Sequence, residues 1–303
     1  MYLVVGATGT LGGSVSKRLL ESGDRVRVLV REPSPARAAG PHTDPEELRR
    51  AGAEVVRGDL KDRDSLREAL DGVRVVVSTA SGTKRAPPDT TATVDAEGTA
   101  NLAAAAARAG VRKVVLVSAA GASGDAPPGL FQDKWRGEEA VRASGVPYVI
   151  LRPARYMGVW IGFLLGTQLA SGGGVVELVG DGSKPASFVE EDDVAAVTAQ
   201  LARDPRSGPA EILELATERA TYPELVERIG RVLGAPLSVR YLPVGADVTT
   251  APPELAPVLT RLLTIHALVP PYDVEDRSVA DRYGVTLGGI DDFLRRALSP
   301  QPA

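Results

Sequence analysis

Short apolar runs rich in valine, isoleucine and leucine alternate, through the first half of the chain, with longer stretches of mixed polarity. Nearly continuous β-branched runs are typical of strands that are covered on both faces, and the longer stretches predict helices between them. The predicted strands are residues 2–5, 25–30, 54–57, 74–78, 113–118 and 148–151. The predicted helices are residues 14–22, 46–51, 64–70, 94–109 and 134–143.

This alternation predicts an α/β protein with a Rossmann-type, doubly wound parallel sheet. Ligands of such sheets gather outside the carboxyl ends of the strands, so the residues that follow each strand are the first candidates for a site. We expect a dinucleotide-binding domain over residues 1–155, to which 187–218 return. Residues 156–186 and 219–303 are then expected to form a smaller, mostly C-terminal substrate lobe.

The pattern is weaker after Arg152. Residues 157–170 are apolar and contain Trp160 and Phe163, so they suit either a lid over a flat hydrophobic substrate or an ordinary core helix. A Pro-, Ala- and Gly-rich segment, residues 32–45, is expected to be an exposed loop. The other elements predicted here are helices 190–201 and 222–233, strands 211–216 and 238–242, and further helices with proline breaks from 245 to 303.

Three glycines follow the first strand. Gly6, Gly9 and Gly12 have the G-x-x-G-x-x-G spacing and lead into the first helix. Such glycines permit a tight turn, a close approach of the backbone to a pyrophosphate and close packing of helix on strand. The start of the helix then offers amide groups to the anion. The predicted cofactor cradle therefore includes Thr8, Thr10 and Leu11 as well as the glycines.

The end of the second strand indicates which dinucleotide binds. An acidic residue at this place binds the ribose 2′-hydroxyl of NAD, whereas an arginine accommodates the 2′-phosphate of NADP. The residue here is Arg31, and a guanidinium fits a phosphate with two hydrogen bonds. Glu32 follows it and could offer a carboxylate, but we expect NADP(H) ahead of NAD(H).

The amino-acid composition argues against several classes of binding partner. A net charge of -4 gives no electrostatic footprint for nucleic acid or an anionic membrane. The chain has no cysteine, which excludes disulfides and thiol catalysis, and its two histidines, His42 and His266, are too far apart in sequence to indicate a metal site. No run is long enough for a membrane span or has the form of a signal peptide, so the expected location is the cytoplasm.

Several motifs in order resemble the NmrA-like, or atypical short-chain dehydrogenase, family, which includes isoflavone and phenylcoumaran ether reductases and NADPH quinone reductases. They are GATGTLGG, VRVLVRE, GDLKDRDSLREALDG, DAEGTANLAAAAARAGVRKVVLVSAAG, EEAVRASGVPYVILRPARYM and DDVAAVTAQLARDP. The resemblance implies NADP(H) as cofactor. It also implies that Asp59 and Leu60 lie near the adenine, and that Thr79, Ala80 and Ser81 lie near the nicotinamide ribose.

The usual proton donor of short-chain dehydrogenases is a tyrosine four residues before a lysine. Here Leu130 stands four residues before Lys134, while Phe131 gives the F-x-x-K of the isoflavone-reductase branch, in which the lysine is the base or proton donor. Lys134 is therefore the main catalytic candidate, although it could only bind the nicotinamide ribose. Ser118, at a strand end, could bind a substrate oxygen, and Tyr156 could reach the mouth of the crevice.

Two positions depart from the family pattern, since Asp95 and Gly158 stand where asparagines are common. We expect an NADPH-dependent reductase of a small or medium apolar carbonyl, enone or quinone, monomeric or homodimeric, with a role in bacterial secondary metabolism as one setting. Two other functions remain open. One is an NADP(H)-binding redox sensor without turnover, and the other is an isomerase or dehydratase that uses NADP as a returning catalyst.

Overall fold

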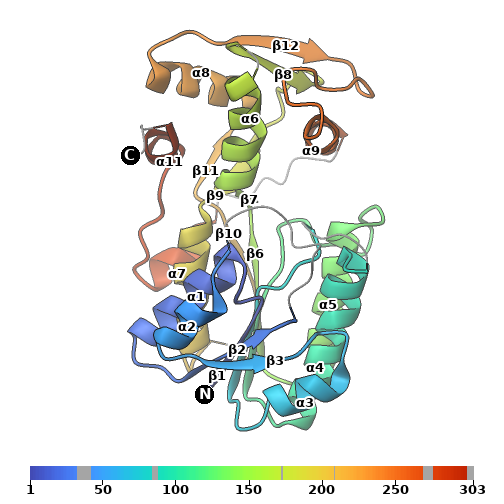
Figure 1. The fold of residues 1–303 in the computed structure, drawn as a ribbon, viewed down its shortest axis with the longest axis vertical. Helices are drawn as coiled ribbons and strands as arrows, with labels where there is room; N and C mark the ends of the chain where they lie inside the picture. Colours follow the sequence, from blue (N-terminus) through green and yellow to red (C-terminus); the bar gives the residue numbers. More distant parts are fainter. Residues whose placement is uncertain (33–41, 84–87, 172, 208, 269–275, 299–303) are drawn as a thin grey trace. The chain divides into compact units, whose positions relative to one another are not determined.

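A computed structural model describes residues 1–32, 42–83, 88–171, 173–207, 209–268 and 276–298 (Figure 1). The chain divides into two compact units. The first unit consists of Met1–Pro153, Asp192–Glu214 and Val279–Val285, and the second of Ala154–Glu191, Leu215–Ser278 and Thr286–Ala303. Most of the predicted loop 32–45 lies outside the described residues.

A parallel sheet organises the first unit, and its described part has seven strands in the order β10-β6-β5-β4-β1-β2-β3. Register is parallel across the sheet, and the edge strand β10 also runs parallel, because the amides of Tyr148 and Ala154 bond successively to the carbonyls of Pro209 and Leu215. This confirms the predicted doubly wound fold. The strands are β1 (Tyr2–Val5), β2 (Val26–Val30), β3 (Glu54–Arg57), β4 (Val75–Ser78), β5 (Lys113–Val117), β6 (Tyr148–Pro153) and β10 (Ala210–Leu215).

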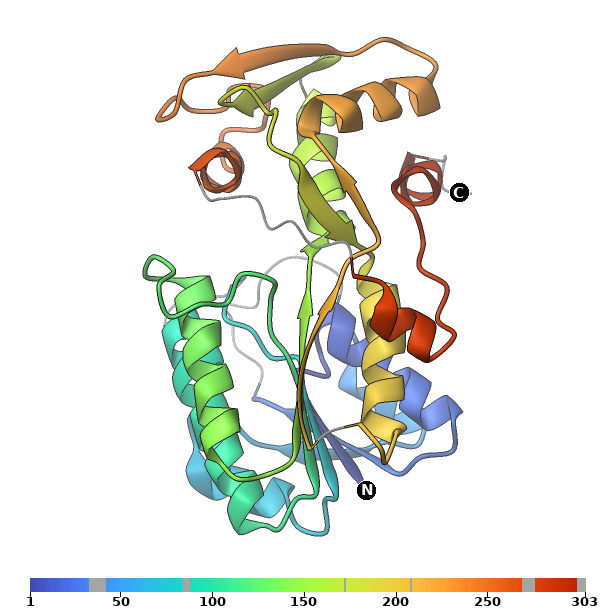
Figure 2. The same cartoon turned by 180° about the vertical axis from the view of Figure 1, so that it is seen from behind.

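Helices cover both faces of this sheet, as Figures 1 and 2 show. On one face lie α3, α4 and α5, and on the other lie α1, α2 and α7. The side chains of Ser14 and Arg18 bond to Asp192, which fixes α1 against α7. The bounds are α1 (Thr10–Glu21), α2 (Pro45–Arg50), α3 (Arg63–Ala69), η1 (Ala92–Gly98), α4 (Thr99–Arg108), α5 (Leu130–Ala143), α7 (Glu191–Arg203) and α10 (Ser278–Arg282).

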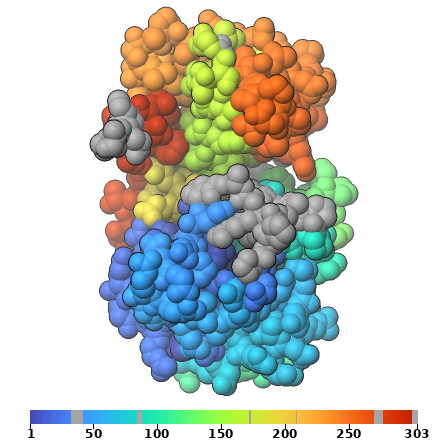
Figure 3. All heavy atoms as spheres, viewed as in Figure 1, coloured from blue at the N-terminus to red at the C-terminus, as the bar shows by residue number. Residues whose placement is uncertain are grey.

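The core of the first unit follows from the apolar runs of the sequence. Leu3, Val76, Val114 and Ile150 come from four adjacent strands, and each is at most 1 % exposed. They pack in one cluster with apolar residues of α3 and α4, among them Leu102. Removing this apolar surface from water stabilises the layered arrangement and holds the carboxyl ends of the strands along one edge. In the space-filling view, the described atoms of the first hundred residues are blue to cyan (Figure 3).

The predicted helices of the first unit are present, but several of their bounds differ. The helix expected over 14–22 begins at Thr10. The helix expected over 94–109 begins as a π-helical segment, η1, before it continues as α4. The helix expected over 134–143 begins at Leu130. Lys134 consequently lies in the second turn of α5, a rigid position, and not at the start of the helix.

The second unit contains two small sheets, of strand order β11-β9-β7 and β12-β8 within the described residues. Helix α8 confirms the expected helix 222–233. Thr221 and Glu224 form a reciprocal cap at its start, and Gly234 ends it in the left-handed conformation. The bounds are β7 (Arg155–Tyr156), η2 (Gly158–Phe163), α6 (Leu164–Ser171), β8 (Val175–Val179), β9 (Ala186–Val189), β11 (Glu218–Ala220), α8 (Tyr222–Leu233), β12 (Ser238–Leu242), α9 (Ala256–Leu268) and α11 (Ile290–Leu298).

A buried carboxylate ties β8 to the segment before α9. Glu177 is 1 % exposed and accepts hydrogen bonds from the amides and hydroxyls of Thr249 and Thr250 and from Arg240. Burial opposes the charge of Glu177, but these donors outweigh it and lower its pKa to about 2. The folded second unit therefore favours ionised Glu177.

Glu177 is expected to make the second unit sensitive to acid. Its folded-state pKa is depressed, so its contribution is complete above the unfolded pKa of about 4.5 and disappears as pH falls towards 2. At neutral pH Glu177→Gln should lower the free energy of unfolding by about 3 kcal/mol, and this gap should close between pH 5 and pH 2. Denaturant titrations across that range measure it, with Glu227→Gln, an exposed helical glutamate, as the control. A gap that does not vary with pH would contradict the assignment.

Candidate active site

The glycine turn between β1 and α1 has the form of a phosphate cradle. Gly6 has φ of +87°, which a residue with a side chain rarely adopts. A Cβ on Gly12 would lie 2.3 Å from the Gly6 carbonyl oxygen, so only glycine permits this approach. Gly9, the N-cap of α1, is extended, and it has no side chain to cover the first amides of the helix. The residues at this turn therefore fit a bound pyrophosphate.

The predicted cofactor residues stand at the carboxyl ends of four adjacent parallel strands. Parallel neighbours end at one edge, so the sheet brings these segments together. Leu60 differs from the other predicted contacts, because the residue is 6 % exposed, its side chain packs in the core and its carbonyl accepts a hydrogen bond from Asn101. The positions are Gly6, Thr8, Gly9, Thr10, Leu11 and Gly12 after β1, Arg31 after β2, Asp59 and Leu60 after β3, and Thr79, Ala80 and Ser81 after β4.

Arg31 belongs to a cluster of four charged side chains. Its guanidinium bonds to Asp89 and lies 4.0 Å from Asp59. The Lys61 ammonium bonds to both carboxylates, at 2.7 Å from Asp89 and 2.8 Å from Asp59. Burial opposes both charges, but these hydrogen bonds raise the pKa of Lys61 and lower that of Asp89. Lys61 and Asp89 are therefore both ionised at neutral pH.

Lys134 is held by a second buried carboxylate. The Lys134 Nζ lies 3.0 Å from an oxygen of Asp95, and the two side chains are 11 % and 1 % exposed. The other Asp95 oxygen accepts the Gly82 amide at 2.8 Å, and Ser81 lies within reach at 3.4 Å. Asp95 thus joins the predicted catalytic lysine to the loop after β4, where the nicotinamide ribose is expected.

Ser118 is bonded to a third carboxylate. Its hydroxyl donates to Glu138, which is fully buried in α5 and also pairs with Arg152 at 2.6 Å. Ser118 is 4 % exposed. Its hydrogen is therefore directed to Glu138 in this structure, which weakens the prediction that it donates to a substrate oxygen.

Tyr156 is part of the second unit, where it forms strand β7. Burial and the charge of Glu191 raise the pKa of its phenol, so it is a neutral group that can donate one proton to a hydrogen bond. Nearby in the chain, Arg155 lies over the ring of Trp160, at 4.9 Å from the ring centroid. The predicted catalytic role of Tyr156 stays a prediction.

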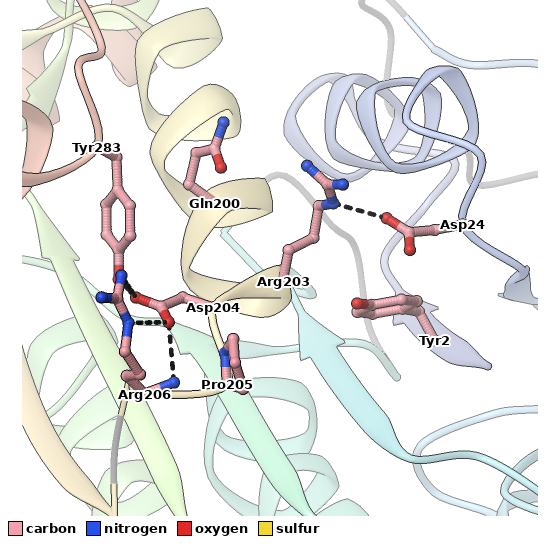
Figure 4. A pocket seen from close by; sticks show the side chains of 8 residues that line it. All are labelled: Tyr2, Asp24, Gln200, Arg203, Asp204, Pro205, Arg206 and Tyr283. Carbon is pink, nitrogen blue, oxygen red and sulfur yellow. Dashed lines mark hydrogen bonds and ion pairs between the residues drawn. The ribbon is translucent and has the colours of Figure 1, made fainter.

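An open cavity of about 520 Å³ lies at the other edge of the central sheet (Figure 4). Tyr2 begins β1 and Asp24 precedes β2, so this cavity is at the amino ends of the strands. Its charges are paired with one another: Arg203 lies 2.9 Å from Asp24, and Asp204 accepts bonds from Arg206 and Tyr283. It is therefore separate from the edge that carries the glycine turn.

Three acidic residues and a lysine near the candidate site make contacts that their sequence pattern did not predict. Asp89 and Glu138 contact residues far along the chain, Arg31 and Ser118, and have no motif of their own. Asp95 was visible only as a departure from the family asparagine. Lys61 lies two residues after Asp59, a predicted adenine contact, and this short separation was the one sequence feature that pointed to Lys61 as a site residue. The described residues contain no group of side chains arranged for a metal ion, and none of their helices could cross a bilayer.

Comparison with known proteins gives the family. The NmrA-like family profile matches residues 2–282. The chain is 35% identical over 262 residues to a (4-alkanoyl-5-oxo-2,5-dihydrofuran-3-yl)methyl phosphate reductase of Streptomyces griseus. The matched region covers 84% of this chain and 83% of that protein.

Two solved structures extend the comparison. AtPrR2 with NADP+ and (+)pinoresinol is 25% identical, with a TM-score of 0.71, over 98% of each chain. Citrobacter sp. triphenylmethane reductase complexed with NADP(H) has a TM-score of 0.79 over 98% of this chain and 100% of that one; at 21% identity it supports the fold. The resemblance found in the motifs is confirmed, and the chain belongs to the NmrA-like family.

Proposed function

We propose that this protein is an NADPH-dependent reductase of a small or medium apolar carbonyl, enone or quinone. The class is an NAD(P)H-dependent oxidoreductase and the cofactor is NADP(H). The observation that carries the proposal is the ion pair between Lys134 and Asp95, which holds a proton-bearing side chain beside the loop after β4. A lysine that served only as a solvated surface charge would have no buried carboxylate partner in the first unit, which also carries the dinucleotide cradle.

The first unit offers groups for each part of the cofactor. The glycine turn and the start of α1 would hold the pyrophosphate, and Arg31 would hold the 2′-phosphate. The backbone at Asp59 and Leu60 would lie at the adenine, and Thr79 and Ser81 at the nicotinamide ribose. When bound, NADPH supplies a hydride from its nicotinamide ring.

Lys134 supplies the proton in this proposal. Reduction of a carbonyl adds a hydride to carbon and a proton to oxygen, and the Lys134 ammonium carries that proton at Nζ. Asp95 holds the ammonium in place and limits its rotation, which orients one N–H for transfer. Ser118 and Glu138 stabilise the strand end beside it, and Tyr156 is a candidate for contact with substrate.

The substrate class rests on the relatives and on the residues that carry aromatic surface. The Streptomyces griseus relative is named as the reductase of an alkanoyl dihydrofuranone that also carries a methyl phosphate, and AtPrR2 was solved with pinoresinol. In the second unit of this chain, Trp160 and Phe163 are only partly buried at the edge of an apolar cluster. These observations support an unsaturated or aromatic substrate, and bacterial secondary metabolism is one setting that supplies such compounds.

A panel of quinones, enones and aryl ketones tests the proposal. Loss of NADPH absorbance is followed with each compound, and product is identified by mass. The proposal predicts turnover with at least one compound class and a clear preference for NADPH over NADH. Binding of NADPH without turnover of any compound would contradict it.

Arg31→Ala is expected to reveal the cofactor preference. Removing the guanidinium should weaken NADP+ binding about 10- to 100-fold, because a charge-assisted bond to phosphate contributes about 1.5 to 3 kcal/mol. NAD+ lacks that phosphate, so its affinity should change less than about twofold. Calorimetric titration measures both constants, with Arg67→Ala, an exposed arginine of α3, as the matched control. An equal loss for the two dinucleotides would contradict the role of Arg31.

A redox sensor without turnover is the second candidate function. The observation in its favour is that Leu130 stands where the usual tyrosine donor would be. A sensor should bind NADP+ and NADPH with different affinities, consume neither, and retain a partner protein in only one redox state. A third candidate, the NADP-using isomerase or dehydratase, would convert its substrate with no net change in NADPH.

A further inference from the structure

Arg31 already bonds to an anion of its own chain. Its partner Asp89 lies 58 residues further along, three residues before the start of η1. The side chain of Asp89 is 13 % exposed, against 29 % for that of Arg31. Lys61 bonds to the other oxygen of the same carboxylate. Asp89 therefore binds both cations through separate oxygens, as a bridging phosphate would.

The two carboxylates of this cluster differ in what they contact. Asp59 lies at the edge of bonding distance from Arg31, at 4.0 Å, and its side chain is 31 % exposed. Asp89 is the more buried of the two and bonds to Arg31 directly. With two cations and two carboxylates the cluster has no net charge, so it does not attract a further anion as it stands.

A ribose 2′-phosphate needs the donors that Asp89 uses. The phosphate carries close to two negative charges at neutral pH and would meet the Asp89 carboxylate as a like charge if both approached Arg31. Binding of that phosphate to Arg31 thus requires that Asp89 give up its bond. A protein whose binding-competent state is only partly populated shows a correspondingly weaker apparent affinity.

We infer that Asp89 competes with the 2′-phosphate of NADP(H) for Arg31 and Lys61, and that it sets how strongly the protein distinguishes NADP(H) from NAD(H). The inference rests on the proposed function for the identity of the cofactor. It adds Lys61 to the residues of the phosphate site and assigns Asp89 a negative contribution to affinity. NAD(H), which has a hydroxyl at this position, does not displace Asp89.

Asp89→Asn in the full-length chain tests this inference by binding alone. Dissociation constants are measured by calorimetry for NADP+ and NAD+, and for the shorter probes adenosine 2′,5′-bisphosphate and 5′-AMP. The expected result is about tenfold tighter binding of the two ligands with a 2′-phosphate and a change below about twofold for the other two. Asp71→Asn, an exposed aspartate of the same unit, removes the same charge away from the cluster and should change none of the four.

A second variant separates competition from simple scaffolding. Lys61→Met should weaken the 2′-phosphate ligands at least about tenfold, roughly the effect of one charge-assisted bond, and leave 5′-AMP unchanged. If Asp89 only shapes the loop before η1, then Asp89→Asn should weaken all four ligands together. Thermal unfolding of each variant identifies a folding defect, and Asp89→Ala provides an independent substitution with the same expected direction.

The outcomes distinguish this inference from the proposed function. Binding of NADP+ by the unaltered protein, with no tightening in either Asp89 variant, overturns the competition and leaves the cofactor assignment intact. Absence of dinucleotide binding in the unaltered protein and in both variants overturns the cofactor assignment, and the competition fails with it. Tightening of NADP+ and NAD+ by equal factors also overturns the competition.

Discussion

Replacing Lys134 with methionine is expected to lower kcat about 100- to 10,000-fold, the usual contribution of a positioned proton donor. Methionine keeps the length and apolar stem of the side chain but removes the ammonium that pairs with Asp95 at 3.0 Å. The stem should still fill its place in α5, but the buried Asp95 carboxylate loses its counter-ion, so the free energy of unfolding should also fall. Thermal unfolding checks that the variant is folded at the assay temperature. The loss should appear in kcat, with a change in the NADPH dissociation constant below about fivefold.

The split between turnover and binding decides what Lys134 does. If Lys134 only binds the nicotinamide ribose, Lys134→Met should weaken NADPH and leave kcat at saturating cofactor nearly unchanged. Steady-state kinetics with a substrate from the quinone and enone panel, together with calorimetry of NADPH, measure both quantities. Lys17→Met, at an exposed lysine of α1, is the matched control and should change neither. Unchanged kcat would rule out the proposed role.

Asp95 explains why this chain can hold a lysine so deeply. Taking an ammonium out of water is costly unless an opposite charge and hydrogen bonds replace the solvent. Asp95 provides the charge, and the Gly82 amide in turn binds the second Asp95 oxygen. The asparagine that is common at this position in the family could make the hydrogen bonds but not the ion pair. The ion pair with Lys134 therefore depends on the carboxylate at position 95.

Much of the first unit could be predicted from sequence because its strands are parallel and covered on both faces. The sequences of such strands are uninterrupted β-branched runs, whereas in the helices between them apolar residues recur every three or four positions. Residues 175–189 were not predicted as strands, although β8 is an apolar run. Glycines flank β8 on both sides, and β9 is short, so neither stretch is distinct from a loop in pattern alone.

The candidate site was predictable where it depends on local chemistry and not where it depends on distant pairs. The glycine spacing and Arg31 are read within one β-α-β unit, so their placement follows from the fold. The partner of Arg31 lies 58 residues away and that of Ser118 lies 20 residues away. No periodicity encodes such pairs, because they arise only when the sheet brings separate strand ends together.

Glu138→Ala should lower the free energy of unfolding by about 3 to 5 kcal/mol, the usual cost of removing one partner from a buried ion pair. Glu138 is fully buried and accepts bonds from Ser118 and from two nitrogens of Arg152. Without it the Arg152 guanidinium, whose side chain is 20 % exposed, loses its buried counter-ion, and a cavity opens between α5 and the ends of β5 and β6.

The next residue of the same helix provides the control for this prediction. Glu139 is 43 % exposed and pairs with Arg142 one turn along, so Glu139→Ala should change the free energy of unfolding by less than about 0.5 kcal/mol. Urea titrations of both variants and of Glu138→Gln measure the difference. Glu138→Gln keeps the shape and can accept from Ser118 but not neutralise Arg152, so its loss should lie between the other two. Equal stabilities for Glu138→Ala and Glu139→Ala would show that the buried pair does not stabilise the strand ends on which the proposed site is built.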